Sequence, residues 1–269
     1  MALIADWKED YYDIWLNIRF EFIKNWKAKR TLIAAGISLV LSAMFYFIIS
    51  LSGSEFPTES NEFLATSMGF VQFLLMLNAV LFGADSLNSE HHKKTALLVY
   101  PLPQRRSVIV FGKFIVQLIS SWGVILIYYG ITAMEVSVIY GWDHLTLDLI
   151  KSYLFSCLYM SALLAVAFFL SALMENPAVS MALTFFLLFL FFPVLNAVFN
   201  LIDFDTSWIF TNYSKFIMDV FRFPAESFGP SARFRSAEDL DFYKGVWICL
   251  MNVFGFFIGS WILTLRREA

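Results

Sequence analysis

The sequence predicts an all-α polytopic membrane protein with six transmembrane helices. Of its 269 residues, 59% are hydrophobic and 15% are charged, whereas a soluble domain has about 45–50% and about 25%. The mean hydropathy is +0.68, and the apolar residues gather in six runs of roughly 20 residues, enough to cross about 30 Å of hydrocarbon. Since no polar stretch could hold a second domain, residues 1–269 are expected to form one membrane domain.

Residues 7–29 are predicted to form an amphipathic helix before the first span. Aromatic and aliphatic residues recur there every three or four positions: Trp7, Tyr11, Ile14, Trp15, Ile18, Phe22 and Trp26. The opposite face carries Asp10, Asp13, Asn17, Glu21 and Lys24. Such a helix should lie in the plane of the inner leaflet, either as a plain anchor or as an elbow helix that moves with the first span. A charged, aromatic segment of this length also argues against a cleavable signal peptide.

The six predicted spans cover residues 31–51, 63–84, 108–139, 150–173, 177–201 and 245–265. The third is too long for the hydrocarbon core alone, so it should extend beyond the membrane or tilt. Lys and Arg gather before the first span, between the second and third, and after the sixth, while the loop 52–62 has acidic residues and no basic ones. By the positive-inside rule, both termini are predicted to be cytoplasmic.

Two connections have clear signals. Asn176 can cap the fifth span, and Pro177 suits its first position because that N–H is unpaired anyway. Residues 202–243 are predicted to be a long extracellular loop. Its first half should form one amphipathic helix on the outer surface, broken by Pro224 and later residues. The residues that indicate this helix are Trp208, Ile209, Lys215, Phe216, Ile217, Asp219, Val220, Phe221 and Arg222.

The inner loop 85–106 is the most informative segment. It is charged from Glu90 to Lys94, then apolar to Tyr100, and then broken by Pro101 and Pro103. This order favours a short helix that ends at the prolines, although a plain solvated basic loop has a similar composition.

The spacing in this loop resembles that of the type-2 ABC transporter permeases, the membrane subunits of ATP-driven exporters. The matching residues are Glu90, Thr95, Pro103, Arg106, Gly112 and Lys113. Lys94 stands where the family usually has Gly, which is a departure in the local turn. The layout over the whole chain is also similar, with an N-terminal interfacial helix, six spans, a long last outer loop and both ends inside.

The resemblance implies that the loop docks into a groove of a separate ABC ATPase. The residues assigned to this coupling are Glu90, Thr95, Leu97, Leu98, Tyr100, Pro103 and Arg106. It also implies two ATPase copies, a second permease chain (identical or homologous), a membrane lipid environment and no role for nucleic acid. Because the chain has no G-x-x-x-x-G-K-[ST] phosphate loop, ATP and Mg²⁺ are expected on the partner and no cofactor on this chain.

The pathway or dimer seam is predicted along the Phe-rich fifth span, at Leu188, Phe192, Pro193 and Leu195. Pro193 should kink this span and free a carbonyl there. In the sixth span, Gly255 and Gly259 form a small-xxx-small pattern that allows close packing.

Other chemistries have weaker support. Cys157 and Cys249 lie in apolar runs and are expected to be packing residues. Adjacent His91 and His92 point to different helix faces, so no metal site is expected. Two alternatives stay open: a secondary transporter or channel, and a membrane-embedded lipid-modifying enzyme. The first should show inverted halves, and the second a His, Asp or Glu cluster at one membrane depth.

Overall fold

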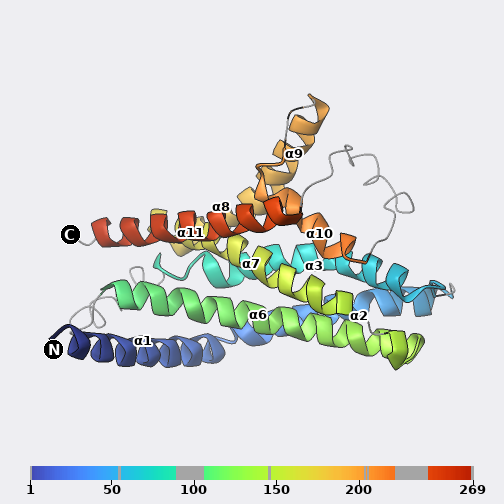
Figure 1. Cartoon of the computed structure of the whole chain (residues 1–269), viewed down its shortest axis with the longest axis horizontal. Helices are drawn as coiled ribbons and strands as arrows, with labels where there is room; N and C mark the ends of the chain where they lie inside the picture. The colour runs from blue at the N-terminus through green and yellow to red at the C-terminus, as the bar shows by residue number, and fades with distance from the viewer. Residues whose placement is uncertain are drawn as a thin grey trace.

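Six long apolar helices dominate the computed structural model, which confirms the all-α class (Figure 1). The structure describes residues 2–53, 56–88, 106–144, 147–202, 204, 206–221 and 242–267, with the backbone alone at residues 2–13, 106, 107, 144, 265 and 267. The helices able to span a membrane are α2 (Arg30–Ser52), α3 (Ser60–Gly83), α6 (Arg106–Ile139), α7 (Leu147–Leu173), the continuous run Pro177–Leu201, and α11 (Phe242–Arg267).

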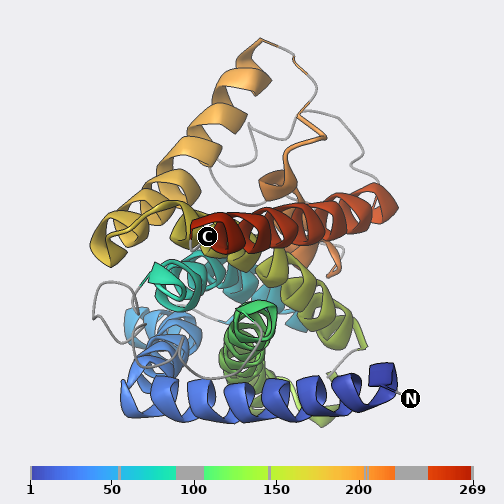
Figure 2. The same ribbon diagram turned by 90° about the vertical axis from the view of Figure 1, so that its left-hand side faces the viewer.

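An N-terminal helix, α1 (Ala2–Lys27), lies across one end of the bundle and over the first turns of α6 (Figure 2). A turn with Lys29 in the left-handed region (φ 59°) joins it to α2. The side chains of Trp15, Phe22 and Trp26 are exposed on the face away from the bundle. This helix covers most of the segment predicted to be helical, and the aromatic side chains on its outer face are exposed.

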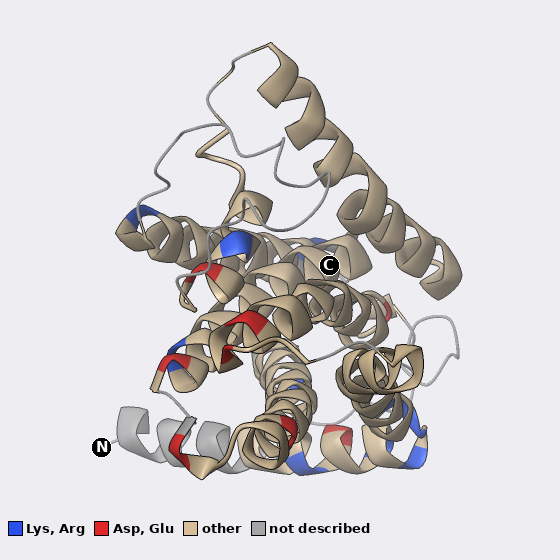
Figure 3. Ribbon diagram, turned by 90° about the vertical axis from the view of Figure 1, so that its right-hand side faces the viewer, with Lys and Arg blue, Asp and Glu red and all other residues tan. Residues whose placement is uncertain are grey.

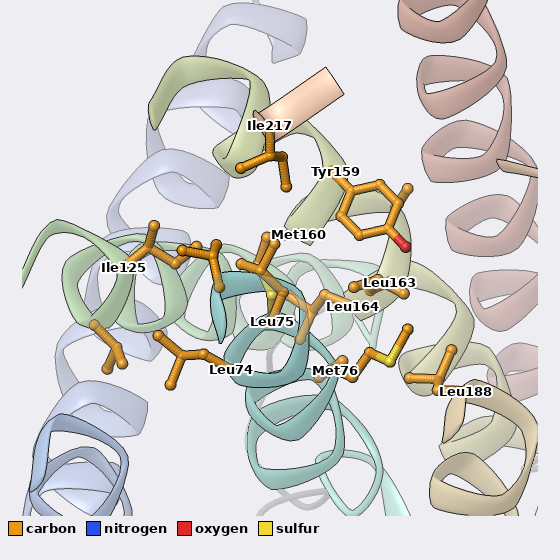
Figure 4. Packing of buried hydrophobic residues seen from close by; sticks show 14 of the residues in the cluster. Leu74, Leu75, Met76, Ile125, Tyr159, Met160, Leu163, Leu164, Leu188 and Ile217 are labelled. Atoms are coloured by element: carbon orange, nitrogen blue, oxygen red, sulfur yellow. The ribbon is translucent and has the colours of Figure 1, made fainter. Parts of the chain in front are cut away.

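The centre of the core is α7, whose sequence alternates large apolar residues with Ala and Ser. It packs against α3, α6 and α11, and Met160, Leu163 and Leu164 contribute to the buried cluster shown in Figure 4. A Cβ added at Gly83 would lie 2.6 Å from the Cβ of Ala167. The lack of a side chain at Gly83 therefore lets the end of α3 approach α7 closely, since helix backbones come closest where small residues meet.

The fifth span starts as predicted and is then interrupted. The Asn176 side chain accepts a hydrogen bond of 2.9 Å from the Ala178 amide, and Pro177 begins α8 (Pro177–Phe186). A π-helical turn (η2, Leu187–Phe191) follows, and α9 (Phe192–Leu201) continues from it with Pro193 in its first turn. The run then leans away from the other spans (Figures 1 and 2), and no charged residue colours it in Figure 3.

The segment after α9 packs inward against the bundle. The single helix predicted there is divided into a 3-10 helix, η3 (Phe210–Lys215), and a short α-helix, α10 (Phe216–Asp219). These two helices pack against α3, α7 and α11. The buried apolar side chains in and beside them are Ile209, Phe210, Tyr213, Ile217 and Phe221. This apolar face therefore completes the core at that end of the bundle.

Candidate functional site

The predicted coupling residues from Glu90 to Pro103 lie outside the described residues, and Arg106 is described only as the first backbone position of α6. The structure does describe the two ends of this loop. Residues 84–88 follow α3, and residues 106–117 open α6. These two stretches, with the side chains that hold them, are called the loop frame below.

The entry into the loop is held by side chains of α7 and α8. The Ser180 hydroxyl of α8 donates to the Ala84 carbonyl. The Ser171 hydroxyl of α7 accepts from the backbone N–H groups of Leu87, at 3.0 Å, and of Asn88, at 3.4 Å. These bonds satisfy backbone groups just past a helix end, which otherwise have no intrahelical partner. The direction in which the chain leaves α3 is thereby fixed.

A buried carboxylate adds a charged contact at the same place. The Asp85 carboxylate accepts two hydrogen bonds from the guanidinium group of Arg30, which lies at the start of α2. Arg30 Nη1 donates to Oδ1 at 2.6 Å, and Nη2 donates to Oδ2. The Asp85 side chain is 5% exposed, whereas Arg30 is 28% exposed. A bidentate pair fixes orientation as well as distance, so α2 cannot rotate at its start without moving residue 85.

The exit from the loop is joined to α1. Lys113 Nζ of α6 lies 2.8 Å from Glu21 Oε1 of α1, and the two side chains are only 4% and 7% exposed. One turn further on, Asn25 Nδ2 donates to Gln117 Oε1 at 3.0 Å. Lys24 also reaches Glu21, at 3.1 Å, from a more exposed position.

Close backbone packing accompanies these polar contacts. A Cβ added at Gly112 would lie 3.2 Å from the Cβ of Asn17. Asn17, Glu21 and Asn25 are four residues apart and so share one face of α1. This polar face, predicted only as the side opposite the aromatic residues, is therefore the surface that binds α6. The signal that could have revealed it is Lys113 with Gln117 one turn later, two polar residues inside an otherwise apolar run.

The predicted seam residues do not share one environment. Leu188 is fully buried and belongs to the core cluster of its own chain (Figure 4). Phe192 packs against Phe210, with ring centroids 5.5 Å apart. Pro193 lines a cavity described below, and Leu195 is half-buried. The large hydrophobic residues that α9 exposes are Val194, Val198 and Leu201.

A family model described as ABC-2 family transporter protein matches residues 29–204, roughly two thirds of the chain. The chain belongs to the ABC-2 transporter family. Comparison with curated proteins finds no match. With its six candidate spans, the ABC-2 chain is a multi-pass membrane protein and the membrane permease part of its transporter, a type of subunit that is typically non-catalytic. ABC-2 permeases generally pair with ABC ATPases.

The matched range includes residues 84–88 and 106–117, whereas Glu21 and Asn25, which hold the second stretch, precede it. It includes the predicted coupling loop, all of α6 and the run Pro177–Leu201, whereas all of α1 and α11 lie outside it. Among the described residues, no group of three His, Cys, Asp or Glu could hold a metal ion.

Proposed function

We propose that this ABC-2 chain is the permease subunit of an ATP-driven exporter and that residues 89–105 dock it to a separate ATPase. The observation that supports this most is the loop frame. A segment of 17 residues is held at its entry by α2, α7 and α8, and at its exit by α1 through α6. Both ends are fixed by bonds whose partners are buried or partly buried, so a displacement of the loop is passed to the spans.

The mechanism follows from the connections at each end. Closure of two ATPase subunits on ATP would move the two loops that they hold. The Lys113–Glu21 and Asn25–Gln117 contacts make α1 and the start of α6 one mechanical unit, while Arg30–Asp85 makes α2 follow the entry side. In this proposal α1 lies in the inner leaflet and both termini are cytoplasmic, as the charge bias of the loops predicts.

The pathway is proposed to form between two permease chains. Spans α2, α9 and α11 expose much of their apolar surface, and α9 leans out from the body of the chain (Figure 2). Because Leu188 is used by its own core, the proposed seam is formed by the exposed face of α9 that carries Val194 and Val198. Its partner is a second chain, identical or homologous.

Substitution Leu98→Asp tests the docking role of the loop. A charge placed in a desolvated contact costs several kcal/mol, so we expect normal membrane insertion and loss of the co-purifying ATPase. Leu147→Asp is the matched control, because Leu147 is 73% exposed and begins α7, remote from the loop in the chain. Undiminished ATPase binding by Leu98→Asp would remove this loop from the docking surface.

A further inference from the structure

A cavity of about 310 Å³ lies between α3, α9 and η3. Its lining residues are Gln72, Met76, Pro193, Asn196, Ala197, Asn200, Thr211, Asn212, Ser214 and Lys215. None of them belongs to the loop frame. The volume is at the lower end of the range of about 300–1,000 Å³ that is typical of small-molecule sites.

The lining is rich in amides and hydroxyls, although an apolar helix forms one of its walls. Four residues with carboxamides, Gln72, Asn196, Asn200 and Asn212, line it together with two hydroxyl residues, while no carboxylate does so among the described residues. Asn212 Nδ2 already donates to the Thr206 carbonyl and the Ser214 hydroxyl to the Thr211 carbonyl. The lining cation, Lys215, is an exposed residue. Polar side chains within an apolar span are costly unless they are paired, and such residues mark binding sites or pathways.

Asn196 shows what kind of group the cavity lacks. Its Nδ2 donates to the Thr211 hydroxyl at 3.0 Å. Its Oδ1 is buried and has no hydrogen-bond partner among the described residues. A buried acceptor without a donor destabilises the structure. Because this oxygen has almost no accessible surface, the Asn196 amide must turn toward the cavity before a ligand O–H or N–H group can satisfy it.

The interruption of the fifth span explains why the cavity exists. Pro193 cannot donate a helical hydrogen bond, and the π-helical turn Leu187–Phe191 directly precedes α9. Such turns occur frequently at functional sites. After this turn α9 leans away from the bundle (Figure 1), which leaves room beside η3.

The helical period divides α9 into two faces. Pro193, Asn196, Ala197 and Asn200 follow one another at steps of three, one and three residues, so they share the face toward the cavity. Val194, Val198 and Leu201 are exposed on the neighbouring face. A molecule in this cavity therefore meets hydrogen-bonding groups on one side and an apolar helix surface beside it.

We propose that this cavity binds the uncharged, hydroxyl- or amide-bearing head group of an amphipathic molecule, whose apolar part lies along the exposed face of α9, in the proposed pathway between the two permease chains. Carboxamides both donate and accept hydrogen bonds, which matches a hydroxyl or amide. An organic cation would instead call for carboxylates, and a phosphate for several cations or backbone N–H groups. The inference rests on the proposed function, because it names the class of molecule that the exporter would carry.

Binding to the full complex, reconstituted in phosphatidylcholine nanodiscs with its ATPase, tests this proposal. The probes are a short-chain glucosylceramide with a fluorescent acyl chain, phosphatidylglycerol with the same chain, and sphingosine with the same fluorophore. We expect saturable binding of glucosylceramide alone. Ala197→Trp, which fills the cavity, and Asn200→Leu, which removes an amide, should each weaken it about tenfold or more. Asn252→Leu is the matched control, since its amide donates to the Ile248 carbonyl of its own helix.

Equal binding of phosphatidylglycerol or sphingosine would overturn the proposal, and so would unchanged glucosylceramide binding in both cavity variants. Each variant is first checked for a single species in size-exclusion chromatography, and if Ala197→Trp does not fold, Asn200→Leu decides. Retention of the ATPase is scored in the same samples. A chain that binds glucosylceramide without holding an ATPase keeps the cavity proposal and refutes the exporter proposal, so the two failures are distinguishable.

Discussion

Removal of the Lys113 charge should loosen α1 from α6. The ion pair with Glu21 is 2.8 Å long, and both side chains are less than a tenth exposed. Lys113→Met therefore leaves a carboxylate buried with one fewer partner, and breaking such a pair from one side costs about 3–5 kcal/mol. Lys24, 3.1 Å from Glu21 and 38% exposed, offsets part of this loss. The expected decrease in the free energy of unfolding is about 2–4 kcal/mol.

A double-mutant cycle measures the pair directly. Lys113→Met, Glu21→Leu and the double variant would be unfolded by SDS titration in mild detergent. Because the double variant leaves neither charge buried alone, it should be more stable than the sum of the single losses by at least about 1.5 kcal/mol. Hydrogen exchange of residues 14–27 should accelerate in the single variants.

The matched control is Lys24→Met, which removes the exposed member of the cluster and should cost no more than about 1 kcal/mol. Additive single losses, with a coupling below about 0.5 kcal/mol, would show that the pair does not hold α1. Unchanged hydrogen exchange of α1 in the single variants would refute the same reasoning.

Three further outcomes are expected. Asp85→Asn breaks the bidentate pair with Arg30 and should lower the free energy of unfolding by about 1.5–3 kcal/mol. The control Asp148→Asn, in an exposed pair, should lower it by under about 1 kcal/mol. Equal losses in the two variants would contradict the role given to Asp85. Cysteines at Val194 or Val198 should cross-link between two chains, while a cysteine at Leu188, buried in its own core, should not; the reverse pattern would move the seam. For topology, cysteines that should label from outside intact cells are Ser54→Cys, His144→Cys and Ser231→Cys. Those that should stay unlabelled are Ser89→Cys and Ala269→Cys, and external labelling at residue 89 would reverse the orientation.

The spans could be predicted from the sequence because their signal is a one-dimensional count of apolar residues. The third predicted span, residues 108–139, ends where α6 ends, at Ile139. Its excess length is explained by the first turns of α6, which pack against α1. The start of the fifth span could also be predicted, because the Asn176 cap and the Pro177 position depend only on adjacent residues.

Contacts between segments that are distant in the sequence could not be predicted from it. Glu21 was assigned to a polar face, but its partner Lys113 lies 92 residues away, and sequence period alone does not pair two helices. Leu188 and Val194 have the same apolar character in the sequence, yet one is buried and the other exposed. Gly255 and Gly259 also differ in their surroundings, although they belong to one sequence pattern. A Cβ added at Gly259 would lie 2.9 Å from the ring of Phe169 in α7, whereas one added at Gly255 would have nothing within 4 Å.

The mass of the intact complex tests the central claim most directly. The chain, tagged and expressed in its native cells, would be purified in mild detergent, and the mass of the complex would be measured by native mass spectrometry. The account predicts two permease chains with two ATPase chains, and loss of the ATPase from the complex in Leu98→Asp but not in Leu147→Asp. A monomeric chain of 31.0 kDa that binds no ATPase under the same conditions would contradict it.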